Sequence, residues 1–130
     1  MTHHLHIAFS ADAGRLSLVV KAQNGAGWKT LATLSQAGEG TMFLDWQAMI
    51  FALQYAAQHG AKRATLYSHL PCIEAMQARR WVTDGRYKAP CIVITDDSYV
   101  YNLTAWRLIL GMGGAVEFVK IAEDRNEAGS

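Results

Sequence analysis

The end of one predicted strand carries a residue that could do chemistry. Residues 65–70, TLYSHL, form a short apolar and β-branched run that is typical of a buried strand and leads to the polar His69. In folds that build a site at the carboxyl ends of strands, a catalytic acid would occupy this position. His69 could instead ligate a metal ion together with Asp45, although two ligands make a weak site. The simpler interpretation of His69 is a polar strand end that faces water.

Asp45 is the second candidate, because its helix predicts an unusual environment for a carboxylate. Glutamines mark the solvated stripe of a helix predicted over residues 42–59, and Asp45 lies about 160° from Gln47 around that helix. A carboxylate turned away from water is either paired or part of a site. We expect a partner such as Lys120 or a local hydrogen bond, with a role in a site as the alternative.

Residues 79–88, RRWVTDGRYK, predict a surface that binds nucleic acid. Basic and aromatic side chains are interspersed in this segment, which contains only one acid, and this mixture suits phosphates and stacked bases. The candidate nucleic-acid-binding residues are Arg79, Arg80, Trp81, Arg86, Tyr87 and Lys88. The alternative is an exposed loop whose aromatic side chains pack on the edge of the domain.

Three histidines near the start of the sequence, His3, His4 and His6, form a pattern that could bind a metal ion. His4 and His6 share one face of a predicted strand, but neither acids nor thiols accompany them. We therefore interpret these histidines as part of an irregular N-terminus.

The composition predicts one folded cytoplasmic domain over residues 1–130. With 51% hydrophobic and 18% charged residues, the chain is long enough for one core and too short for two. No apolar run reaches the ~20 residues of a membrane helix, so no membrane partner is expected. Cys72 and Cys91 form no metal-binding motif and are expected to be free thiols. The net charge of +1 restricts any nucleic-acid contact to a local basic patch.

Hydrophobic periodicity and turn residues predict a mixed α/β fold. Three strands come first, followed by helices interleaved with two more strands, in the order β-β-β-α-β-α-α-β. The predicted strands are 5–11, 16–23, 28–35, 64–68 and 115–121, and the predicted helices are 42–59, 71–78 and 98–112. The first three strands form an antiparallel meander, and the fourth lies parallel to one of them. The fold class is therefore a mixed five-stranded sheet flanked by helices.

Four stretches of the sequence resemble the ribonuclease H-like family, and most closely its bacterial type I branch. FSADAG at 9–14 stands where the family has a strand ending in Thr-Asp-Gly. FLDWQAMIFALQYAAQHGAKRATLYS at 43–68 is similar to the family's glutamate-bearing helix and the strand after it. NLTAWRLILGMGGAVEFVKI at 102–121 and RNEAG at 125–129 resemble a later helix and strand and the start of the final helix.

The resemblance implies a nuclease site whose acids are mostly missing from this chain. Family members hold two Mg²⁺ ions with four carboxylates and cut the RNA strand of an RNA–DNA hybrid. The family-equivalent positions are Ala11, Asp45, His69 and Ser130, so one acid of four remains. The family's loop histidine has no counterpart, and its paired asparagines fall near Thr41 and Met42.

We therefore expect a catalytically degenerate ribonuclease H-like domain, without a cofactor, that acts as a nucleic-acid-binding or assembly module. Its expected partner is an RNA–DNA hybrid or another nucleic acid. One alternative is a residual Mg²⁺-dependent nuclease that cleaves such hybrids with Asp12, Asp45 and either Asp124 or Glu123 in a rearranged site. The other alternative is a structural homodimer formed through the apolar run 91–95 or the largely apolar 42–59 helix.

Overall fold

The computed structural model describes residues 4–24, 27–77, 82–83, 86–87, 99–113 and 115–129. The backbone alone is described for Asn24, Val82, Thr83, Arg86, Tyr87 and Tyr99. Several of the predictions above fall outside the described residues. They concern His3, Arg79, Arg80, Trp81, Lys88, the apolar run 91–95 and Ser130.

A five-stranded sheet is built as the sequence predicts. Its strands are β1 (His4–Asp12), β2 (Arg15–Asn24), β3 (Gly27–Ala37), β4 (Arg63–Ser68) and β7 (Val116–Lys120). The first three strands pair antiparallel, whereas β4 pairs parallel to β1 and β7 pairs parallel to β4. The order across the sheet is β3-β2-β1-β4-β7, so β1 and β4 are neighbours and their carboxyl ends meet at one edge.

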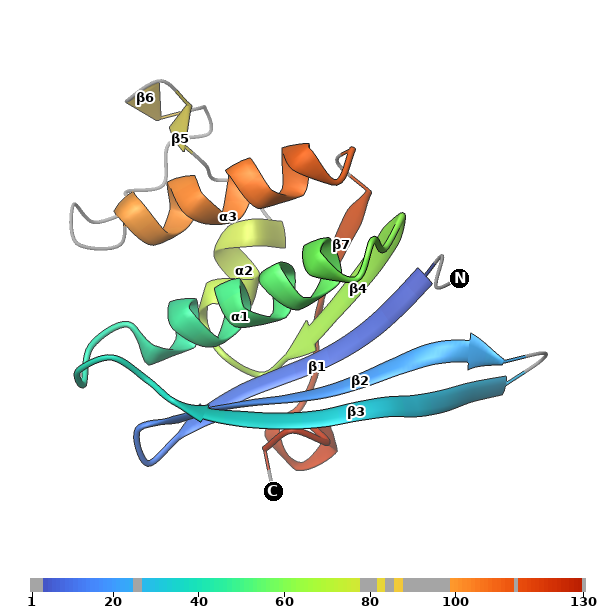
Figure 1. The fold of residues 1–130 in the computed structure, drawn as a ribbon. Coiled ribbons are helices and arrows are strands. Elements are labelled where there is room, and N and C mark those ends of the chain that lie inside the picture. The colour runs from blue at the N-terminus through green and yellow to red at the C-terminus, as the bar shows by residue number, and fades with distance from the viewer. Residues whose placement is uncertain are drawn as a thin grey trace.

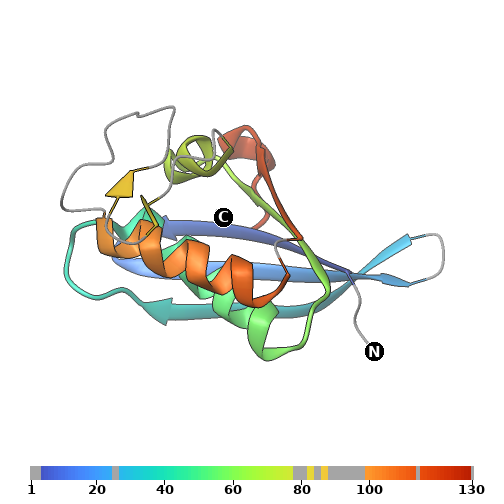
Figure 2. The same cartoon turned by 90° about the horizontal axis from the view of Figure 1, so that it is seen from above.

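The helices gather on one side of this sheet. They are α1 (Leu44–Gln58), α2 (Cys72–Gln77) and α3 (Tyr99–Gly111), and two short strands, β5 (Val82–Thr83) and β6 (Arg86–Tyr87), pair near α3. Figure 1 shows the helices above the sheet and the C-terminal segment, with the 3₁₀ turn η2 (Glu123–Arg125), below it. Viewed from above, α3 lies over α1 (Figure 2).

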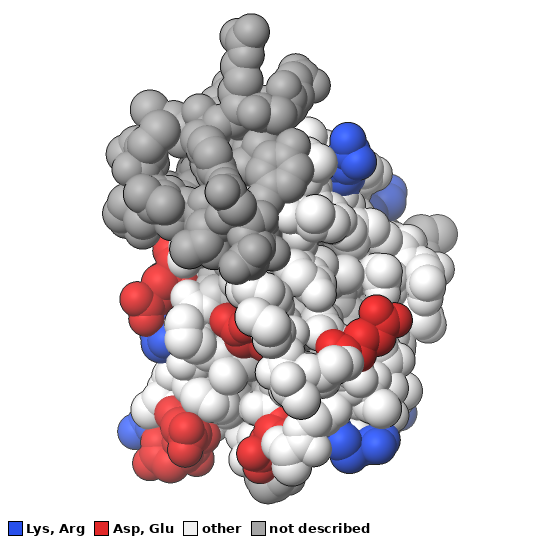
Figure 3. Space-filling view, turned by 90° about the vertical axis from the view of Figure 1, so that its left-hand side faces the viewer, with Lys and Arg blue, Asp and Glu red and all other residues white. Residues whose placement is uncertain are grey.

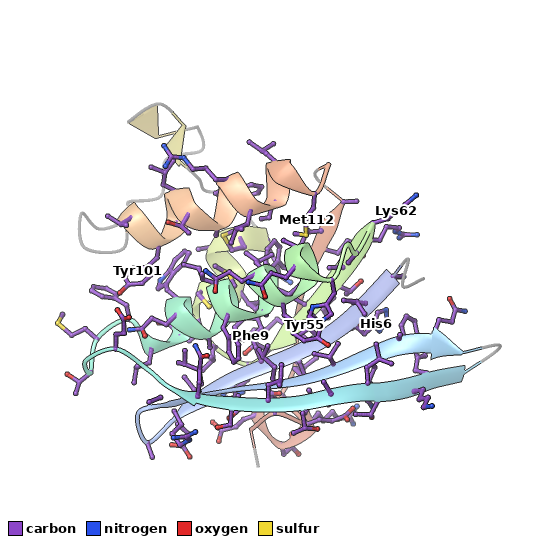
Figure 4. The ribbon with its side chains drawn as sticks, viewed as in Figure 1. His6, Phe9, Tyr55, Lys62, Tyr101 and Met112 are labelled. Carbon is purple, nitrogen blue, oxygen red and sulfur yellow. The ribbon has the colours of Figure 1, made fainter. Side chains whose placement is uncertain are left out.

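Strand alternation decides which face of β1 meets the helices. Leu5, Ile7 and Phe9 are fully buried, whereas His4 and His6, which alternate with them, are only half-buried. Phe9 points from β1 toward α1 (Figure 4). The two histidines therefore face away from the helices, on what we call the outer face of the sheet.

The helix α1 is largely apolar because it is in contact with other elements on two sides. This helix packs against β1 and β2 and also against α3. Its buried residues are Trp46, Ala48, Met49, Ala52, Leu53 and Ala56. Packing against the sheet and against α3 thus covers most of the apolar surface that, from the sequence, could have been a dimer contact. Among the described residues, no helix combines the length and hydropathy that crossing a bilayer requires.

Candidate functional site

Three of the predicted site positions gather at the edge where β1 and β4 end. Ala11 lies near the end of β1, and His69 directly follows β4, whose Tyr67 pairs with Ala8 of β1. Asp45 stands in the first turn of α1, and its backbone carbonyl accepts a 3.4 Å hydrogen bond from the Cys72 Sγ at the start of α2. The fold therefore brings Ala11, Asp45 and His69 to one end of the molecule.

His69 is held at this edge by the C-terminal segment. The Asn126 Nδ2 lies 3.0 Å from His69 Nδ1, and the Glu123 Oε1 lies 3.5 Å from His69 Nε2. The His69 side chain is only 18% exposed, whereas that of Glu123 is 81% exposed. The prediction that His69 is a strand end facing water is therefore wrong, because a segment distant in sequence covers the ring.

Asn126 determines the tautomer of the His69 ring. Its Oδ1 accepts a hydrogen bond from the Ala128 backbone N–H at 3.0 Å, so its Nδ2 must be the group that faces His69 and Phe9. An amide nitrogen donates and does not accept, so His69 Nδ1 accepts. In the neutral ring the proton then resides on Nε2, which points toward the Glu123 carboxylate.

The backbone carbonyl of Phe9 is the centre of this arrangement. It accepts one hydrogen bond from Ser68 Oγ at 2.7 Å and another from Asn126 Nδ2 at 2.9 Å. Ser68 and Asn126 are buried, and the Ser68 Oγ also accepts from the Leu70 N–H at 3.1 Å. We call Phe9, Ser68, His69 and Asn126 the strand-end network. Its hydrogen bonds satisfy the polar groups that β1 and β4 would otherwise leave open.

Lys120, the ionic partner that the sequence suggests for Asp45, pairs with another acid. The Lys120 Nζ lies 2.8 Å from Glu74 Oε1, which holds the pKa of the Glu74 carboxyl below its usual value. Asp45 is half-buried beside Cys72. Burial, followed by the negative charge of Asp45, raises the pKa of the Cys72 thiol well above its usual value, so this thiol stays protonated.

The described residues do not fit the pair of Mg²⁺ ions that the fold implies. The Ala11 side chain offers no oxygen, and His69 Nδ1 already accepts a hydrogen bond from Asn126. No three His, Cys, Asp or Glu side chains of the described segments lie close enough together to hold a metal ion. On the face that shows this edge, carboxylates appear as separate groups divided by uncharged surface (Figure 3). Two divalent ions side by side need clustered oxygen ligands, which this arrangement lacks.

The acids of the residual-nuclease alternative are likewise separate. Asp12 is exposed at the turn between β1 and β2, and Asp124 is exposed in η2. Glu123 faces the His69 ring. The described residues thus form no cluster of carboxylates of the kind that a residual nuclease needs.

The loop before α1 holds the positions of the family's paired asparagines. Thr41 and Met42 are exposed there. Gln47 closes the loop, because its Nε2 donates to the Glu39 and Met42 carbonyls and its Oε1 accepts from the Glu39 N–H. The Gln47 side chain is therefore half-buried in the loop, which corrects its assignment to the solvated stripe of the helix.

The sequence-based analysis missed a second group of residues on the outer face of the sheet. His6 stacks on Trp28 with ring centroids 3.5 Å apart, and Tyr67 Oη lies 3.0 Å from His6 Nδ1. His4 Nε2 lies 2.9 Å from Thr65 Oγ1. The interpretation of His4 and His6 as an irregular N-terminus is therefore wrong. Their shared strand face was the available signal, but the partners come from β3 and β4.

Burial changes the titration of this second group. Burial lowers the pKa of His4, with a smaller contribution from Arg63 in the same direction. Burial also lowers the pKa of His6, assisted by the neighbouring His4, and raises the pKa of Tyr67. The neutral forms of these side chains are thus favoured in the folded protein.

Comparison with known proteins identifies the fold. No family model and no curated protein matches the sequence. Among solved structures, the N-terminal RNase H domain of a Mycobacterium tuberculosis protein is similar over 96% of this chain and 92% of that one, with 13% identity and a TM-score of 0.65. RNase H1 of the halophilic archaeon Halobacterium salinarum NRC-1 is 17% identical over 98% of this chain and 91% of that one, with a TM-score of 0.62.

A third solved structure, that of LC11-RNase H1 in complex with an RNA/DNA hybrid, has a TM-score of 0.67. It covers 95% of this chain and 88% of that one at 16% identity. At these identities the similarity concerns the architecture. The chain has a ribonuclease H-like fold, which confirms the fold class that the sequence predicts.

Proposed function

We propose that this chain is a degenerate ribonuclease H-like protein that binds nucleic acid without two-metal hydrolysis. The observation that carries the proposal is the engagement of His69 at a position where the family has a metal-binding acid. Its Nδ1 accepts from Asn126 and its Nε2 faces Glu123, so the ring serves the fold. Ala11 supports the same conclusion, because a methyl group cannot ligate a metal ion.

The expected partner is an RNA–DNA hybrid, held by the basic and aromatic residues of segment 79–88. LC11-RNase H1, which has the same fold, was solved in complex with such a hybrid. The strands β5 and β6 belong to this segment, and β5 lies beside α3 and pairs with β6 (Figure 1). The composition of the segment supports phosphate contacts and base stacking, and the loss of the acids does not affect either interaction.

The test is a fluorescence anisotropy titration of a labelled RNA–DNA hybrid at two salt concentrations. We expect binding that weakens as salt rises and that an Arg79/Arg80/Arg86 triple alanine variant loses. A Lys29/Lys62/Arg63 triple alanine variant is the matched control, since it removes the same charge from exposed positions elsewhere. Lys62 lies beyond the C-terminal end of α1 (Figure 4). An equal loss of binding in both variants would contradict a localised interface.

A cleavage assay tests the second half of the proposal. The protein is incubated with the same hybrid and Mg²⁺ or Mn²⁺, and we expect no cut RNA. Metal-dependent cleavage that is abolished in Asp45→Asn would show a working nuclease and overturn the proposal. Absence of hybrid binding at low salt, combined with salt-insensitive self-association, would instead favour an assembly role.

A further inference from the structure

The outer face of the sheet carries a hollow with an aromatic wall. Trp28 extends from β3 across β2 to stack on His6 of β1, with an interplanar angle of 26°. Tyr67 of β4 stands on the other side of His6, with ring centroids 5.2 Å apart. Trp28 is 41% exposed, so a further planar ring can add to this stack. Three neighbouring aromatic side chains thus border one surface site.

The remaining lining of the hollow is apolar at its floor and charged at its rim. Its volume is about 260 Å³. Besides the three rings, it is lined by Ala8, Val19, Lys21, Ile121, Arg125 and Glu127. Drug-sized ligands occupy pockets of roughly 300–1,000 Å³, so this hollow can enclose one ring of such a ligand while the rest lies at the surface. We call it the aromatic hollow.

The rim offers a cation for an anionic ligand. Lys21 Nζ pairs with Glu127 Oε1 at 2.6 Å, so their charges compensate each other. Arg125 is exposed and forms no ion pair with any other residue that the structure describes. The lining therefore has one uncompensated positive charge, carried by a guanidinium group that suits a phosphate.

We propose that the aromatic hollow binds a nucleotide, with the base stacked on Trp28 and the phosphate bound by Arg125. A nucleobase presents a π-face to the aromatic wall and a polar edge that the Tyr67 hydroxyl and the Lys21–Glu127 pair can contact. The same chemistry is present in a free mononucleotide and in an unpaired nucleotide of a single strand. This inference is independent of the hybrid-binding proposal, because none of its residues belongs to segment 79–88.

Calorimetric titration of the full chain with adenosine 5′-monophosphate tests the site. Adenosine, inorganic phosphate and a short single-stranded oligoadenylate are titrated in parallel. We expect binding of the monophosphate that weakens about tenfold in Trp28→Ala, because a base loses its stacking partner. Arg125→Gln should weaken it about fivefold, because a charge-assisted hydrogen bond is lost. Tighter binding of the oligoadenylate than of the monophosphate would identify a single strand as the source of the nucleotide.

Arg107→Gln is the matched control, since Arg107 is an exposed arginine on α3, on the opposite side of the sheet. Circular dichroism establishes that each variant is folded, and the exposed Arg125 keeps the test informative if Trp28→Ala does not fold. The proposal is overturned if the folded protein does not bind the monophosphate at millimolar concentration. It is also overturned if adenosine binds equally well, or if Arg107→Gln weakens binding as much as Arg125→Gln does.

Discussion

Two polar regions of this molecule share the strands β1 and β4 and differ in how far their polar groups are already engaged. In the strand-end network, the Asn126 amide and the Ser68 hydroxyl bond to the protein itself, and His69 is covered. In the aromatic hollow, Trp28 is 41% exposed and Arg125 has no ionic partner among the described residues. The first region stabilises the fold, whereas the second retains groups that can bind a ligand.

The difference teaches that position in a fold does not by itself indicate where function resides. The ends of β1 and β4 are where the resemblance would place the acids of a nuclease, yet here His69 bonds to the C-terminal segment instead. Exposed rings and charges without a partner indicate a ligand site better, because a buried polar group that already has partners gains little from a ligand. The following predictions test this distinction.

The largest effect is expected from breaking the strand-end network. Ser68→Ala and Asn126→Ala should each lower the free energy of unfolding by about 1–3 kcal/mol, because each removes a buried donor to the Phe9 carbonyl and the other hydrogen bonds of that side chain. The double variant should lose more than the sum, since the buried Phe9 carbonyl then loses both side-chain donors. Urea denaturation measures all three values.

Gln54→Ala serves as the control, because Gln54 is exposed on α1 and its replacement should change stability by no more than about 0.5 kcal/mol. If Ser68→Ala and Asn126→Ala fall within the same small range, the network does not stabilise the fold and the contrast with the hollow disappears.

Restoring acids at the strand ends should turn the first region into a binding site. Ala11→Asp combined with His69→Asp adds two carboxylates at the edge that already carries Asp45. We expect Mn²⁺ affinity at least about tenfold higher than in the unmodified protein, because clustered oxygen ligands attract hard divalent ions. Calorimetry with Mn²⁺ measures the change.

A Thr33→Asp and Gln54→Asp variant adds the same charge at exposed positions on β3 and α1. Equal Mn²⁺ affinity in the two double variants would mean that the strand ends do not converge as the structure describes them.

A smaller effect on stability is expected from pH, through the two histidines on the outer face of the sheet. Because burial lowers the pKa values of His4 and His6 below their usual 6.5, the unfolded chain binds protons at a higher pH than the folded protein does. These two histidines should therefore leave the free energy of unfolding unchanged well above pH 6.5 and lower it as the pH falls below that value. Denaturation at pH 7.5 and 5.0 should show less difference in His6→Asn than in the unmodified protein.

His59→Asn is the comparison for that measurement, because His59 is exposed at the end of α1 and lies outside the hollow. If both substitutions reduce the pH dependence of stability equally, the histidines on the outer face of the sheet are not its specific cause.

The smallest expected effect concerns the charge beside His4. Arg63 lowers the pKa of His4, but burial contributes more. Arg63→Gln should therefore raise the pKa of His4 slightly and leave it below the usual value, as measured by NMR titration of the imidazole signals. Lys62 is a neighbouring exposed cation, and Lys62→Gln should leave the pKa of His4 unchanged. A larger shift from Lys62→Gln than from Arg63→Gln would contradict the described arrangement.

Local patterns were sufficient to predict the sheet. Alternating apolar residues in β1 and β2, and the Gly60 turn after α1, place the elements within about two residues of their observed ends. The parallel neighbour of β4 was not determined, because a crossover can reach any exposed edge of the first three strands. The short pair β5 and β6 was not predicted, since two-residue strands have too little periodicity to be recognised.

The candidate site was harder to predict, because its hydrogen bonds join distant parts of the sequence. The contact of His69 with Asn126 spans 57 residues, and nothing local to either residue indicates it. The stacking of Trp28 on His6 depends on a side chain that crosses an intervening strand. The residue types could therefore be identified from the sequence, whereas their partners depended on register and topology.

The Phe9 carbonyl has a consequence for the order in which the chain folds. Its donors Ser68 and Asn126 follow it by 59 and 117 residues. During synthesis, the N-terminal strands leave the ribosome long before Asn126 does, and the carbonyl stays hydrated in the meantime. Closure of such long loops is entropically costly, so this network should form late and slow the final step of folding. Nascent chains stalled before Asn126 should accordingly remain more sensitive to proteases than released ones.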